Sequence, residues 1–112
     1  MIDYTEAYRQ GEILIFKLRK RTVYHGAKTV PSGVIRVGEK EGHEHKIVGG
    51  GQLSMFGEKE DGIIQVPPKE TVTLTHPEHA SIKLEGGKDG ASFAVKTQKE
   101  ATGKNRSQSV KD

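Results

Sequence analysis

Four of the five histidines lie in two short motifs, and imidazole is a common ligand for metals and anions in proteins. The first motif contains His43 and His45, and the second contains His76 and His79. Alternate side chains of an extended strand share a face, so His43 and His45 are expected to point the same way. With His76 or His79 from a neighbouring strand, these rings could hold one divalent metal ion or one anionic group.

The composition restricts the kind of metal site that these histidines could form. The chain contains no cysteine, which excludes disulfides and thiolate ligands. Nitrogen and oxygen ligands suit Zn, Fe, Ni, Cu or Mn, and the sequence does not choose among them. Glu44 and Glu78 could serve as an extra ligand, as an acceptor behind a ligand, or as a general base. Unliganded histidines in surface turns are the competing interpretation.

The elements that must position the motifs are predicted to be short strands. Residues 71–76 alternate between polar and apolar, with Val72, Leu74 and His76 on one face. Fourteen glycines and four prolines separate such runs along the chain. These patterns predict an all-β fold of about seven to eight short strands, built as a small β-sandwich, a jelly roll or a barrel-like domain.

Individual segments carry more specific expectations. Residues 13–18 are apolar on both faces, which predicts a central strand covered on both sides. Residues 2–10 are polar and predict one helical turn or a loose arm. The glycine-rich segment 86–90 predicts a hairpin turn. An inward-facing row is expected in the preceding strand: Ala80, Ile82 and Leu84.

A length of 112 residues predicts one domain, which we place at residues 1–100. Residues 101–112 are polar or glycine apart from Ala101 and Val110, and we expect a flexible tail there. No apolar run approaches the length of a membrane span, and the first residues are polar and acidic. We therefore expect no membrane association and a cytoplasmic location.

The net charge of +3, with both signs interspersed, permits a nucleic-acid partner without implying one. A basic cluster could contact phosphates: Lys17, Arg19, Lys20 and Arg21. It has no interleaved aromatic residues for base stacking, so a solvated strand end is the favoured interpretation. Only 32% of residues are hydrophobic, yet residues 13–18 and 63–64 are apolar on both faces, which predicts a homo-oligomer. A structural or assembly protein is therefore an alternative to a metal-binding one.

Two resemblances follow from the histidine motifs. His43-x-His45, with a histidine from another strand, resembles the metal motif of the cupins, but the glutamate and the proline-glycine element of that family are missing. Residues 9–14, 42–45 and 74–82 resemble a family of short prokaryotic and phage proteins without an established activity. This second resemblance runs from Arg9 almost to the end and departs at residues 86–90. It implies a bacterial or phage setting and leaves the function open.

Overall fold

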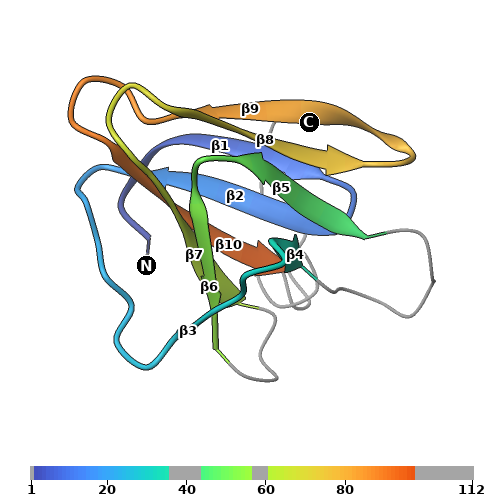
Figure 1. Ribbon diagram of the computed structural model, residues 1–112, viewed down its shortest axis with the longest axis horizontal. Coiled ribbons are helices and arrows are strands. Elements are labelled where there is room, and N and C mark those ends of the chain that lie inside the picture. The colour runs from blue at the N-terminus through green and yellow to red at the C-terminus, as the bar shows by residue number, and fades with distance from the viewer. Residues whose placement is uncertain (1, 36–43, 57–60, 98–112) are drawn as a thin grey trace.

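The computed structural model describes residues 2–35, 44–56 and 61–97, which fold into two antiparallel β-sheets (Figure 1). The six-stranded sheet has the order β1 (Tyr4–Gln10), β2 (Ile13–Leu18), β10 (Ala91–Thr97), β7 (Asp61–Val66), β6 (Gln52–Met55) and β3 (Lys28–Thr29). The four-stranded sheet has the order β4 (Val34–Ile35), β5 (His45–Gly49), β8 (Thr71–His76) and β9 (His79–Glu85). The all-β prediction is confirmed as a sandwich-like arrangement, with ten strands in the described part rather than seven or eight.

The main core fills the space between the two sheets. Alternate residues of the strands point into it, as the period of two in a strand requires. Its largest fully buried side chains come from both sheets and include Ile13, Ile15, Leu53, Phe93, Leu74 and Leu84. Each such side chain contributes about 1.5–3 kcal/mol relative to an exposed position, so this layer is the main source of stability.

Strand β2 is buried on both faces, as its apolar sequence predicted. Ile13 and Ile15 face the main core, whereas Leu14 and Phe16 join Ala94 in a second cluster on the outer side of the six-stranded sheet. The apolar pair in β7 is likewise buried, because Ile63 and Ile64 are 2% and 0% exposed. The apolar faces from which we predicted a homo-oligomer are therefore buried within a single chain. The homo-oligomer itself stays a prediction.

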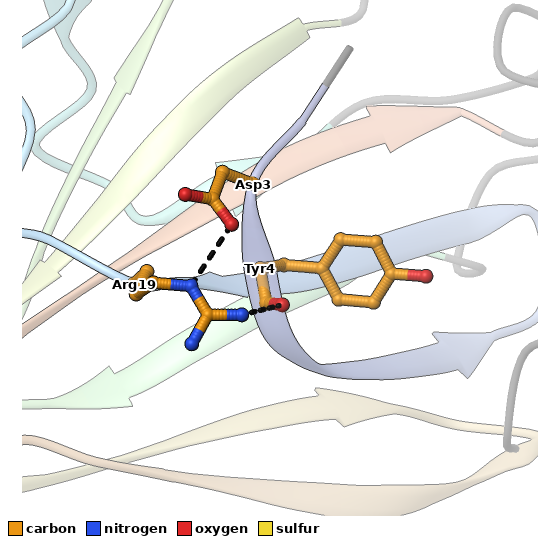
Figure 2. Close-up of polar contacts among 3 residues, drawn as sticks. All are labelled: Asp3, Tyr4 and Arg19. Carbon is orange, nitrogen blue, oxygen red and sulfur yellow. Dashed lines mark hydrogen bonds and ion pairs between the residues drawn. The ribbon is translucent and has the colours of Figure 1, made fainter.

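Strand β1 replaces the helical turn or loose arm that was expected at residues 2–10. It pairs with β2 in the antiparallel sense and forms one edge of the six-stranded sheet. Figure 2 shows how its start is fastened: Arg19 Nε donates to the Asp3 carboxylate at 2.9 Å, and Nη2 donates to the Tyr4 carbonyl at 3.4 Å. The Tyr4 ring also packs on Phe16, with ring centroids 5.0 Å apart.

The connection at residues 86–90 is not the hairpin that the glycines predicted. Strand β9 lies in the four-stranded sheet, whereas β10 lies in the other sheet between β2 and β7. The segment therefore crosses from one layer to the other, and β10 is one of the two central strands of the six-stranded sheet. Strands β6 and β7, by contrast, are neighbours in one sheet and pair in the antiparallel sense.

The β8–β9 hairpin contains an irregularity that matters for the histidines. Leu74 pairs with Ile82 and His76 pairs with His79, so β9 has one residue more than β8 between these pairs. This extra residue shifts the alternation of β9, and Ala80 is exposed instead of facing inward as predicted. Residues 98–112, including the expected tail, lie outside the described residues. No helix in the described ranges could cross a membrane.

Candidate histidine site

Three histidines from three neighbouring strands lie side by side, and we call His45, His76 and His79 the histidine cluster. His45 begins β5, His76 ends β8, and His79 begins β9. The β5–β8 register pairs Lys46 with Thr75, which sets His45 beside His76, and His76 itself pairs with His79. The His45 and His76 ring centroids are 4.4 Å apart, and those of His76 and His79 are 4.6 Å apart. His43 lies outside the described residues.

A buried glutamine holds the innermost histidine in one orientation. Gln10 is 1% exposed, and its Nε2 donates to the Leu74 carbonyl at 2.9 Å and to the Ala80 carbonyl at 2.8 Å. These bonds use both amide hydrogens, so the amide oxygen is the atom that lies 2.9 Å from His45 Nδ1. Because an amide oxygen only accepts, Nδ1 carries the proton and Nε2 of a neutral His45 keeps its lone pair.

The surroundings of His45 keep this ring neutral. Its side chain is 3% exposed, and burial lowers its pKa to about 4, with smaller contributions from the charges of His76 and His79. Desolvation disfavours the charged imidazolium, which explains the direction of the shift. At neutral pH His45 is therefore an uncharged imidazole with an unprotonated Nε2, which is the form that binds metals.

Gly11 allows the rings to pack against the turn between β1 and β2. Its φ of +60° lies in the left-handed region. A Cβ atom at this position would lie 2.9 Å from His79 Nε2 and 3.4 Å from His45 Cε1. Both rings thus approach the same point, which only glycine leaves empty. Gln10 and Gly11 complete this candidate site and were not revealed by the histidine motifs, although both lie in the segment that carried the family resemblance.

The remaining predicted site residues are placed less favourably for metal binding. The Glu78 backbone N–H donates to His76 Nδ1 at 3.0 Å, so a neutral His76 carries its proton on Nε2. The Glu44 and Glu78 residues are exposed. Within residues 2–35, 44–56 and 61–97, no three histidine, aspartate or glutamate side chains are grouped so that they could hold a metal ion.

A cavity of about 350 Å³ opens beside the histidine cluster. It lies between the end of β1 with its following turn and the start of β9, and His79 belongs to both the cavity and the cluster. Seven residues line it: Arg9, Gln10, Gly11, His79, Ala80, Ser81 and Ile82. The cavity therefore gives a small molecule access to one of the three imidazoles.

The basic cluster predicted from the sequence is partly engaged in contacts within the chain. Arg19 pairs with Asp3, and Arg21 Nη1 donates to the Asp89 carbonyl at 3.0 Å. Lys17 is half-buried on β2, whereas Lys20 is exposed. Two of the four cations are thus held by the protein itself, which reduces the surface open to phosphate groups.

A larger cavity, of about 600 Å³, lies near Arg21 on the outer side of the six-stranded sheet. Its lining residue Gln65 is bonded within the chain: Nε2 donates to the Thr22 carbonyl, and Oε1 accepts from Ser92 Oγ. This network fastens the connection between β2 and β3 to the sheet. We therefore regard the histidine cluster, with its oriented imidazole, as the better candidate site.

The comparisons with known proteins identify a family but describe no activity. No curated protein and no solved structure matches the chain. A family model described as a domain of unknown function (DUF8820) matches residues 9–98, a range that contains Gln10, Gly11 and the whole histidine cluster. The resemblance predicted from Arg9 onward thus has a counterpart in this family, while the bacterial or phage setting stays a prediction. Since the match spans most of its length, the chain belongs to the family that shares this domain of unknown function.

Proposed function

We propose that the protein binds a divalent transition metal ion at the histidine cluster, with His45 Nε2 as the central ligand. The observation that carries the proposal is the hydrogen bond between His45 Nδ1 and Gln10 Oε1. Histidines that bind metals commonly donate their other ring N–H to an acceptor that fixes the tautomer. Gln10 fulfils this role and is itself fixed by two backbone carbonyls.

The spacing of neighbouring rings is compatible with two of them sharing one ion, whereas no three described side chains are grouped to hold one. Two imidazoles on one ion, each with a metal–nitrogen distance of about 2.1 Å, have ring centres roughly 4.5 Å apart at a ligand angle of 90° and roughly 5.3 Å apart at the tetrahedral angle. Neighbouring rings of the histidine cluster are at 4.4 and 4.6 Å. His79 is the preferred second ligand, because its Nε2 and the His45 ring approach the same point beside Gly11. His76 would first have to give up its bond from the Glu78 N–H. His43, Glu44 and Glu78 remain predicted additional ligands, together with water.

A bound ion of this kind would polarise a ligand oxygen or lower the pKa of a bound water. The protein supplies a buried neutral imidazole, a rigid acceptor behind it and a neighbouring cavity. The proposal keeps the cupin-like arrangement expected from the sequence, in which histidines of different strands share one ion. It does not imply that the protein belongs to the cupin family.

The test uses untagged protein from which metal has been removed with a chelator. Titration with Co²⁺ should give visible absorption bands, and Zn²⁺, Ni²⁺ or Mn²⁺ should raise the melting temperature. His45→Ala should abolish both effects and His79→Ala should weaken them. His25→Ala is the matched control, because His25 is exposed in a turn outside the cluster. If the wild type gives no cobalt bands and no ion stabilises it, the proposal is wrong.

The other predicted functions have separate tests. A homo-oligomer would sediment above the 12.3 kDa of one chain in analytical ultracentrifugation. Nucleic-acid binding would give salt-dependent retention on DNA. Neither has a specific contact in the described residues that favours it over metal binding.

A further inference from the structure

The cavity beside the histidine cluster is lined by groups suited to an anion. Arg9 provides a permanent positive charge, Ser81 a hydroxyl and His79 an imidazole. No aspartate or glutamate is among the seven lining residues of this described cavity. An anionic group would therefore meet hydrogen-bond donors without a nearby carboxylate from the cavity wall to repel it.

The walls of the cavity are held at a fixed separation. One wall comes from β1 in the six-stranded sheet and the other from β9 in the four-stranded sheet, and these strands run close together at one side of the sandwich (Figure 1). Gln10 Nε2 crosses between the sheets to the Ala80 carbonyl at 2.8 Å. A ligand would thus bind to a largely preformed site, which reduces the entropy lost on binding.

We infer that this cavity binds the oxyanion of a small molecule, either a phosphate or a carboxylate. The planar guanidinium of Arg9 can donate two parallel hydrogen bonds to such a group. Arg9 also takes part in an interaction within the chain, so an incoming oxyanion would have to share the guanidinium with that interaction. The volume of about 350 Å³ is at the small end of the range for ligand sites, roughly 300 to 1,000 Å³.

This inference goes beyond the proposed metal site and does not require it. His79 belongs both to the histidine cluster and to the lining of this cavity, so the two sites would be neighbours. The oxyanion site nevertheless depends on Arg9 and Ser81, which are not proposed metal ligands. The two ideas can therefore fail separately.

The experiment is isothermal titration calorimetry on the chelator-treated full chain, with inorganic phosphate and malonate as separate probes. We expect at least one of them to bind, and the one that binds shows whether the site prefers phosphate or carboxylate. Arg9→Gln should weaken binding at least tenfold, and Ser81→Ala should weaken it several-fold. The control Lys83→Gln removes the same charge from an exposed position of β9 and should change the affinity less than twofold.

Two results would overturn the inference. One is that neither probe binds to folded wild-type protein, and the other is that Arg9→Gln and Lys83→Gln weaken binding equally, which would indicate general charge attraction. If Arg9→Gln does not fold, Arg9→Lys is the second variant, because it keeps the charge but lacks the planar guanidinium. Its affinity for the anion should still be lower than that of the wild type. Cobalt binding without anion binding would contradict this inference alone. Anion binding without cobalt binding would contradict only the metal proposal.

Discussion

Replacing Gln10 by Leu should destabilise the protein more than any other single polar substitution at the site. The substitution retains a side chain of similar size but removes one acceptor and two donor hydrogens. The Leu74 carbonyl, the Ala80 carbonyl and the His45 Nδ1–H would each lose the partner that Gln10 supplies. Water cannot easily replace these partners, because Gln10 is 1% and His45 is 3% exposed.

The magnitude follows from the number of groups that lose a partner. A buried polar group without a hydrogen bond costs about 1–3 kcal/mol, and part of this is regained when the chain relaxes around the new side chain. The Ala80 carbonyl lies in an exposed residue and can recover a bond to water. The Leu74 carbonyl and the His45 Nδ1–H are then left buried without a partner. Together they give a loss of about 3 kcal/mol in the free energy of unfolding, a large fraction of the 5–15 kcal/mol typical of a domain.

Urea denaturation of wild type and Gln10→Leu at pH 7 measures this loss directly. A double-mutant cycle with His45→Leu isolates the contact between the two side chains. The double variant has no Nδ1–H left without a partner. Its loss in the free energy of unfolding should therefore be about 1–2 kcal/mol less than the sum of the two single losses. A Gln10→Leu variant that loses less than about 1 kcal/mol, or a cycle that is additive, would refute the role given to Gln10.

Two further predictions concern the same residues. The stability of chelator-treated protein should fall as the pH drops from about 6.5 to about 4. The pKa of His45 in the folded protein is lowered to about 4, so in this pH range only the unfolded chain binds the proton. The resulting loss in the free energy of unfolding is at most about 3 kcal/mol. Urea midpoints at pH 7 and 4.5 check it, and His45→Leu should show a weaker pH dependence than wild type. Gly11→Ala should destabilise more than Gly87→Ala, because both glycines have positive φ but an added Cβ meets the histidine rings only at Gly11, with nothing within 4 Å at Gly87. Equal melting temperatures of these two variants would contradict the packing argument.

The sequence by itself determined the class of fold, because burial on a strand repeats every two residues. The alternation of residues 71–76 predicted β8, and the apolar run of residues 13–18 predicted a strand buried on both faces. The polar run of residues 2–10 concealed β1, because an edge strand exposed along much of its length lacks a strong apolar pattern. Local periodicity therefore identified the interior strands better than the edges.

The tertiary structure alone decided which residues complete the site. Nothing in the sequence near Gln10 indicates a buried side chain that bonds to Leu74 and Ala80, 64 and 70 positions away. The bonds to these carbonyls coincide with the extra residue in β9, whose position depends on the pairing of β8 and β9. A polar side chain is buried only where groups from distant strands satisfy it, and that arrangement exists only after the two sheets have packed together.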